Sequence, residues 1–163
     1  MDVYEHAMKM EQDGRAFYLE QAGKTAEPAL KRILQELAND ELKHYNLFRA
    51  MRDRESADYK DAEKTTIITT AKNVFEELSE RGGTIAFSND VRKLWEFACE
   101  VEKKSETFYR EKAGEMNDES QKRIWNRIAD EEHRHWNTIE LVIQFLERPK
   151  QWLADAEWNT LED

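Results

Sequence analysis

Two short motifs in this sequence pair a glutamate with a histidine three positions later. The pairs are Glu41 with His44 and Glu132 with His135. Residues three apart lie on the same face of an α-helix, so each motif presents a carboxylate and an imidazole together. Burying both groups in a core is costly unless something compensates them. A bound metal ion would do so.

Both motifs interrupt the apolar face of a predicted amphipathic helix. The apolar positions around the first motif are Leu30, Ile33, Leu34, Leu37, Phe48 and Met51. The apolar positions around the second motif are Ile124, Ile128, Ile139 and Val142. This three-and-four spacing is typical of one helical face. The glutamates and histidines are therefore expected to point inward.

The motifs belong to an internal repeat with an offset of 91 positions, and this offset also pairs Glu11 with Glu102. The flanks agree without a gap. Further matched pairs are Phe17-Tyr18 with Phe108-Tyr109, Ala22-Gly23 with Ala113-Gly114, and Lys31-Arg32-Ile33 with Lys122-Arg123-Ile124. One such motif alone is usually a solvated pair on a charged helix. The duplicated set instead favours two related hairpins, about 3–52 and 91–146, that build one metal site.

The four glutamates and two histidines resemble the ligand set of the ferritin-like di-iron carboxylate superfamily. Residues 10–18 and 40–44 are most similar to the rubrerythrin branch. The resemblance implies an all-α fold, a ferritin-like antiparallel four-helix bundle. A long crossover containing a short helix would join the second helix to the third, and a short helix would follow the fourth.

The resemblance also implies a role for each ligand. The expected metal ligands are Glu11, Glu41, His44, Glu102, Glu132 and His135. Glu41 and Glu132 would bridge two iron ions, Glu11 and Glu102 would be terminal ligands, and each histidine would bind one ion. Manganese or zinc could replace iron. Zinc would bind the same atoms without redox chemistry. Two divalent cations would balance the four carboxylates.

Four further residues are candidates to support the ligands. Asp40 and Glu131 each precede a bridging glutamate and could orient the histidine of the other hairpin through its free N–H. Tyr18 and Tyr109 could hydrogen-bond the carboxylates. The alternative is that the acids lie at the surface and that the tyrosines are ordinary core aromatics.

The resemblance implies a rubrerythrin-type protein that reduces peroxide or dioxygen in oxidative-stress defence. A separate donor such as a rubredoxin would supply electrons, and the chain would form a homodimer. One departure is Ser105, where rubrerythrins carry a further glutamate, so the symmetric ligand set is also similar to bacterioferritin. Gly14 and Ser105 are small and are expected to leave space for the oxidant. The alternatives are a non-catalytic iron-handling protein and a helical interaction protein with a structural site.

Composition limits the other function classes. The 163 residues fit a single domain, and 37% charged residues with few Gly and Pro favour helices. A net charge of −10 argues against nucleic-acid binding and an anionic membrane surface. No run of about 18 apolar residues predicts a membrane span, and the first residues do not resemble a signal peptide, which favours the cytoplasm. Cys99 is the only cysteine, so a four-cysteine rubredoxin centre is excluded.

Periodicity and end signals place the helices. They are expected over about 3–22, 28–52, 67–78, 91–113 and 118–146, with a short packed segment around Trp152 and Trp158. Gly23 is expected to cap the first helix, Pro28 to open the second, residues 81–83 to end the third and Pro149 to mark the end of the last. The expected apolar stripe of the first helix is Val3, Ala7, Met10, Gly14 and Phe17. Of the other chemically active residues, His6 and His133 are expected to be exposed, and Cys99 to be a buried structural thiol.

Overall fold

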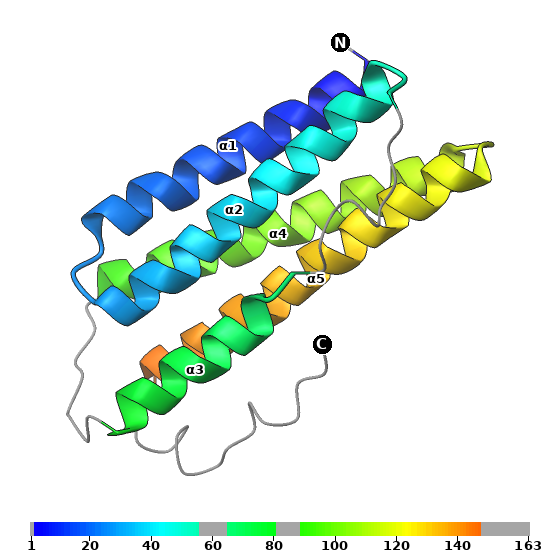
Figure 1. The fold of residues 1–163 in the computed structure, drawn as a ribbon. Coiled ribbons are helices and arrows are strands. Elements are labelled where there is room, and N and C mark those ends of the chain that lie inside the picture. Colours follow the sequence, from blue (N-terminus) through cyan, green and yellow to red (C-terminus); the bar gives the residue numbers. More distant parts are fainter. Residues whose placement is uncertain (1, 56–64, 81–88, 148–163) are drawn as a thin grey trace.

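The computed structural model describes residues 2–55, 65–80 and 89–147, and the ordered elements in this part of the chain are all helices (Figure 1). They are α1 (Val3–Lys24), α2 (Pro28–Arg52), α3 (Ile67–Glu80), α4 (Asn89–Glu115) and α5 (Glu119–Glu147). Helices α1 and α2 form one antiparallel hairpin, and α4 and α5 form the other. Helix α3 lies in the crossover and packs against α2 and α5. The predicted all-α bundle is confirmed.

Local sequence signals explain most helix starts. Asp2 caps α1, its side chain accepting a hydrogen bond of 2.8 Å from the Glu5 backbone N–H. Pro28 occupies the first turn of α2, as expected. Asp118 Oδ1 accepts from the backbone N–H of Ser120 at 2.8 Å and so caps α5.

The expected cap at Gly23 is wrong. Helix α1 continues through Gly23 to Lys24, and Thr25 occupies the capping position. The Thr25 hydroxyl donates a 2.6 Å hydrogen bond to the Gln21 carbonyl, which satisfies a carbonyl at the helix end. The expected end signal at residues 81–83, Pro149 and the segment around Trp152 lie outside the described residues.

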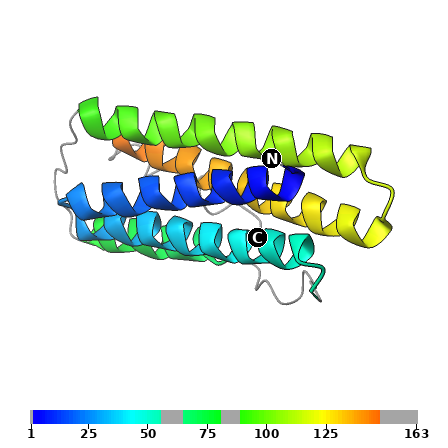
Figure 2. The same cartoon turned by 90° about the horizontal axis from the view of Figure 1, so that it is seen from above.

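In each of the four bundle helices, a polar layer separates two hydrophobic layers. One buried cluster contains the C-terminal part of α1 and the N-terminal part of α2, together with α3 and parts of α4 and α5. The other contains the opposite ends of the same four helices. The predicted ligands fall between the two clusters in every helix. Figure 2, viewed from above, shows the four long helices side by side with their axes roughly aligned.

The buried face of α1 is turned by about one position from the expected stripe. Its buried residues are Ala7, Met8, Glu11, Gly14, Tyr18 and Ala22. Met10 and Phe17, expected inside, are only half-buried. The polar layer explains the difference, because Glu11 and Tyr18 must face the bundle axis. On α2 and α5 the expected apolar positions are all buried.

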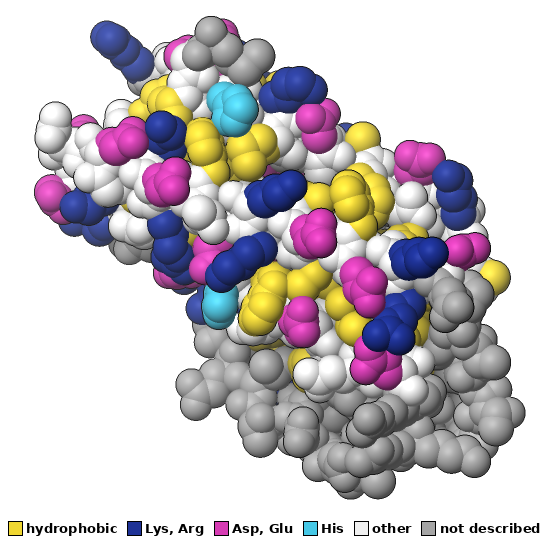
Figure 3. Space-filling model, turned by 180° about the vertical axis from the view of Figure 1, so that it is seen from behind, with side chains coloured by type: hydrophobic (Ala, Val, Ile, Leu, Met, Phe, Trp, Pro, Cys, Tyr) yellow, Lys and Arg dark blue, Asp and Glu magenta, His cyan; other side chains and the backbone are white. Residues whose placement is uncertain are grey.

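Charges of both signs are mixed on the part of the surface that Figure 3 shows. On the face shown in Figure 3, Lys and Arg side chains of the described residues are interspersed with Asp and Glu rather than gathered into a basic patch. Within the described ranges, no helix combines the length and the apolar composition that a membrane span requires.

Candidate metal centre

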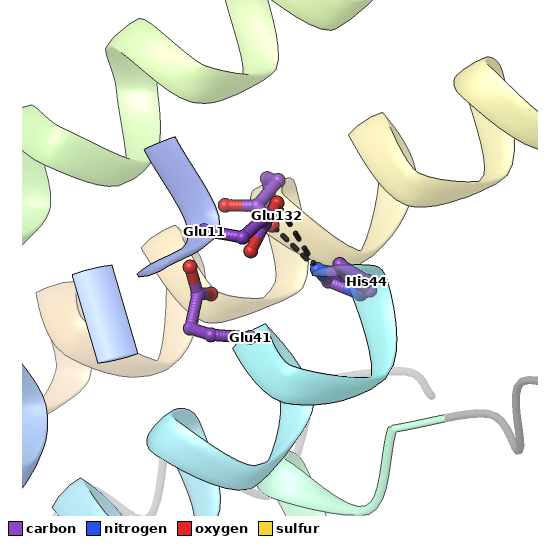
Figure 4. A group of neighbouring side chains, drawn as sticks. All are labelled: Glu11, Glu41, His44 and Glu132. Carbon is purple, nitrogen blue, oxygen red and sulfur yellow. Dashed lines mark ion pairs between the residues drawn. The ribbon is translucent and has the colours of Figure 1, made fainter. Parts of the chain in front are cut away.

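The six predicted ligands come together at the middle of the bundle as two overlapping groups. One group contains Glu11, Glu41, His44 and Glu132, and Figure 4 shows these side chains converging from α1, α2 and α5. The other group contains Glu41, Glu102, Glu132 and His135. In each group the candidate ligand atoms lie within 4.8 Å of one another. Glu41 and Glu132 belong to both groups, and we call them the shared glutamates.

Each of the six side chains has one buried polar atom that makes no hydrogen bond of normal geometry, although His44 Nδ1 and Glu132 Oε1 lie 2.9 Å apart as an ion pair. These atoms are Glu11 Oε2, Glu41 Oε1, His44 Nδ1, Glu102 Oε2, Glu132 Oε1 and His135 Nδ1. The side chains are at most 4% exposed, so water does not satisfy these atoms. Unpaired buried polar atoms are rare and costly in native proteins. One free donor atom from each residue of a carboxylate and imidazole set fits two divalent metal ions.

Carboxylates from the opposite hairpin hold the two histidines. His44 Nε2 lies 2.5 Å from Glu131 Oε2, and His135 Nε2 lies 2.9 Å from Asp40 Oδ2. A carboxylate accepts, so Nε2 carries the proton and Nδ1 is free to bind a metal. Burial would raise the pKa of Asp40, but the bonds from His135 and Thr65 lower it to about 2. These are the contacts that the sequence led us to expect.

The tyrosines also reach across to the opposite hairpin. The Tyr109 hydroxyl donates a 2.6 Å hydrogen bond to Glu11 Oε1, and the Tyr18 hydroxyl donates to Glu102 Oε1. Burial raises the pKa of both phenols well above 10, and the nearby carboxylates raise it further. Both hydroxyls therefore keep their protons. Each bond occupies one oxygen of a terminal glutamate and leaves the other oxygen free.

Sequence reasoning missed two buried polar groups near the centre. The Thr65 hydroxyl, just before α3, donates a hydrogen bond to Asp40. The same Asp40 carboxylate accepts from His135, so Thr65 helps to fix its position. Glu106 is buried on α4 and accepts from His133 Nδ1 at 2.9 Å. His133 is therefore half-buried rather than exposed as expected. The 91-position offset aligns Glu106 with Arg15, which is not an acid. The repeat therefore gave no indication that Glu106 would pair with His133.

Two further residues from the sequence analysis can be placed. His6 is exposed, as expected. Cys99 is buried, and its thiol donates to Glu140 Oε1 at 3.0 Å. Burial and this bond raise the pKa of Cys99 to about 12. The predicted burial of Cys99 is confirmed, and the cysteine belongs to neither ligand group.

The space beside Gly14 is not open. A Cβ atom built on Gly14 would lie 2.7 Å from Glu41 Oε2, well inside a normal contact distance. The sequence-based view that this glycine leaves space for an oxidant is therefore wrong. Its missing side chain makes room for a shared glutamate instead.

The shared glutamates hold protons strongly when no metal is present. Burial raises the pKa of Glu41 well above its ordinary value, and Glu11 and Glu102 raise it further. Burial raises the pKa of Glu132 in the same way, and the carboxylates of Glu102, Glu41 and Glu11 raise it further. Each carboxylate disfavours ionisation of the others.

Three other groups at the centre also have shifted pKa values. The pKa of Glu102 is lowered, whereas those of His44 and His135 are raised. Burial opposes ionisation of Glu102, but His135 and the Tyr18 hydrogen bond lower its pKa. Burial would lower the pKa of His44 and His135, but the facing carboxylates raise it well above 6.5.

We expect the metal-free protein to lose stability as pH rises from 5 to 8. The shared glutamates and the two histidines have raised pKa values in the folded state, so their contribution is complete below the unfolded pKa values of about 4 and 6.5. It is lost as pH rises through the folded values. Asp40 and Glu131 have lowered pKa values and lose their contribution only as pH falls through those values. Thermal unfolding with a chelator, at constant ionic strength, measures the midpoint.

The metal-loaded protein is the control for this prediction. Metal binding requires ionised carboxylates and neutral imidazoles, so affinity increases with pH. The difference in midpoint between loaded and metal-free protein should therefore widen towards pH 8. A metal-free midpoint that rises steadily from pH 5 to pH 8 would contradict the assigned protonation.

Comparison with known proteins agrees with this geometry. A scan against protein-family models matches residues 2–143 to the family described as Rubrerythrin. The matched range contains all six candidate ligands and the acids and tyrosines that hold them. Searches of curated proteins and of solved structures found no match.

Proposed function

This chain belongs to the rubrerythrin family, and from that membership and its site we propose that it reduces peroxide or dioxygen at two iron ions. The coarser description, a di-iron carboxylate protein, follows from the family match. Electrons would come from a separate one-electron carrier such as a rubredoxin, because the only cysteine is Cys99.

The observation that carries the proposal is the set of six free ligand atoms, one from each predicted ligand. Glu11 would bind one ion and Glu102 the other, with one histidine each, and the shared glutamates would bridge them. Iron, when bound, supplies electrons and a coordination position for the oxidant.

Side chains around the site would fix the orientation of the ligands and hold protons close to them. Asp40 and Glu131 fix the histidine tautomers, and the two tyrosine hydroxyls keep protons beside the terminal glutamates. The surrounding hydrophobic layers exclude bulk water. Ser105 replaces the further glutamate that rubrerythrins carry, so we expect the six ligands to keep one arrangement during oxidation.

The test is stopped-flow oxidation of protein that is purified without oxygen and loaded with ferrous iron. We expect two ions per chain and rapid oxidation by peroxide or dioxygen, followed by repeated turnover when reduced rubredoxin is added. The zinc-loaded protein should consume no peroxide, because zinc has no redox chemistry at such a site.

Three results would contradict parts of this proposal. Iron that is oxidised once and then stays in the protein without turnover would indicate an iron-handling protein. Ferrous protein that does not react with either oxidant would remove the oxidoreductase function. Absence of bound metal would leave only a structural role for the polar layer.

A further inference from the structure

A line of redox-active aromatic rings leads from the metal centre to the surface at one end of the bundle. Tyr109 touches the centre through its 2.6 Å hydrogen bond to Glu11. The Tyr109 and Trp125 rings have centroids 5.7 Å apart, and the Trp125 and Tyr4 rings are also 5.7 Å apart. Tyr109 and Trp125 are fully buried, whereas Tyr4 is half-buried and donates to Gln121 Oε1 at 2.6 Å.

The other half of the repeat lacks this line. The 91-position offset aligns Tyr109 with Tyr18, which donates to Glu102 in the same way. It aligns Trp125 with Leu34, an aliphatic residue that cannot carry an electron. The two hairpins are otherwise closely matched in ligands and supporting contacts. The offset pairs Tyr4 with Trp95, which is also redox-active, so Leu34 is the position that interrupts the line in the other half.

We propose that Tyr109, Trp125 and Tyr4 form an electron relay that feeds the metal centre from the surface when peroxide arrives and no donor protein is bound. This inference rests on the proposed function. Conversion of peroxide to two water molecules consumes two electrons and two protons. An oxidised centre holds no reserve of electrons, so nearby side chains must supply them.

Each transfer in the relay is balanced. Tyr109 gives one electron to the oxidised site, and its phenolic proton moves along the hydrogen bond to Glu11. Trp125 then gives one electron to oxidised Tyr109, which takes its proton back from Glu11. Tyr4 in turn gives one electron to oxidised Trp125. A small surface reductant of the thiol or ascorbate class restores Tyr4. Two such passes deliver two electrons to one peroxide molecule, which takes up two protons from solvent and becomes two water molecules. The surface reductant loses the same two electrons and releases two protons to solvent, so every side chain ends unchanged.

Packing alone would also place aromatic rings at this end, because Phe48 contacts both Tyr109 and Trp125 with centroids 5.2 and 4.7 Å apart. Phenylalanine substitutions separate the two explanations, since phenylalanine keeps most of the packing but is not oxidised under these conditions. Tyr4→Phe is the mildest change, because Tyr4 is half-buried and loses only its hydroxyl.

The experiment treats iron-loaded, fully oxidised protein with excess peroxide and no reductant, and follows radicals by freeze-quench electron paramagnetic resonance. Ring-deuterated tyrosine distinguishes tyrosine from tryptophan signals. We expect a tyrosyl radical in the wild type that ascorbate removes rapidly. Tyr4→Phe should shift the signal to tryptophan, and Trp125→Phe should leave a tyrosyl radical that ascorbate removes at least about tenfold more slowly. Trp95→Phe, the same substitution in the other hydrophobic cluster, should behave as wild type.

Two outcomes overturn the relay and differ from each other. If ferrous protein is oxidised by peroxide but the radical species and its reaction with ascorbate are the same in all variants, the relay is wrong and the proposed function stands. If ferrous protein does not react with peroxide at all, the proposed function fails and the relay fails with it. Circular dichroism and metal content of each variant check that folding and loading are unchanged.

Discussion

Replacing Glu41 by glutamine is expected to remove most of the binding of both metal ions. Glu41 belongs to both ligand groups, so its loss affects both positions. The amide has nearly the same size as the carboxylate but carries no charge, so the change tests ligation rather than packing. Metal content after dialysis and calorimetric titration with ferrous or cobalt ions would measure the effect.

Matched variants define the specificity of this result. Glu11 belongs to only one ligand group, so Glu11→Gln should weaken mainly one of the two ions. Glu20→Gln changes an exposed glutamate on the same helix as Glu11 and should leave both ions bound. A Glu41→Gln protein that still held two ions with unchanged affinity would show that Glu41 is not a bridging ligand.

The same substitution should stabilise the metal-free protein above neutral pH. Burial and the charges of Glu11 and Glu102 raise the pKa of Glu41, so ionising it in the folded state costs free energy. The neutral amide removes this cost. Lower metal affinity with a higher metal-free unfolding midpoint is expected of a residue retained for binding rather than for stability.

The ligands could be predicted from sequence because two signals agree on them. Helical periodicity places His44 and His135 on buried faces, and the 91-position offset repeats the set. The partners of the histidines followed from the same repeat, since Asp40 and Glu131 occupy matching positions. Both signals depend on spacing along the chain, which a helix converts directly into geometry.

Other features could not be predicted because they depend on contacts between distant segments. Nothing local to Thr65 indicates that its hydroxyl reaches Asp40 from the crossover. Glu106 has no counterpart in the repeat, and its burial depends on His133 from α5. The orientation of α1 could not be predicted either. Its apolar residues Met10 and Phe17 suggest one buried face, but the face that is turned to the bundle axis carries the polar Glu11.

Gly14 is the residue whose expected role differs most from what the structure shows. The sequence predicted open space for an oxidant here, but the structure places a shared glutamate beside it. A side chain here would meet Glu41 Oε2 at 2.7 Å, and Glu41 Cδ at 3.5 Å. The carboxylate is the far end of a flexible side chain and can move aside when no metal is bound. We propose that the carboxylate needs this space to act as a ligand when metal is bound. Gly14 would then be a positioning residue for a shared glutamate.

Gly14→Ala is expected to weaken metal binding at both positions while stabilising the metal-free protein. Alanine inside a helix is favoured over glycine by about 1 kcal/mol, and moving the Glu41 carboxylate is cheap in the absence of metal. Changes to groups that orient a metal ligand typically cost about 10- to 100-fold in affinity, and we expect a loss in that range. Calorimetric metal titration and thermal unfolding with a chelator measure the two effects separately.

The other helical glycines supply the control. A Cβ at Gly23 or at Gly114 would meet no atom within 4 Å. Gly23→Ala and Gly114→Ala should therefore bring a similar or smaller gain in stability, because both lie near helix ends, and leave metal affinity unchanged. Gly14→Leu should bind metal still more weakly than Gly14→Ala, because a larger side chain displaces the carboxylate further. Full metal affinity in Gly14→Leu would show that Glu41 does not need this space and that Gly14 does not position it.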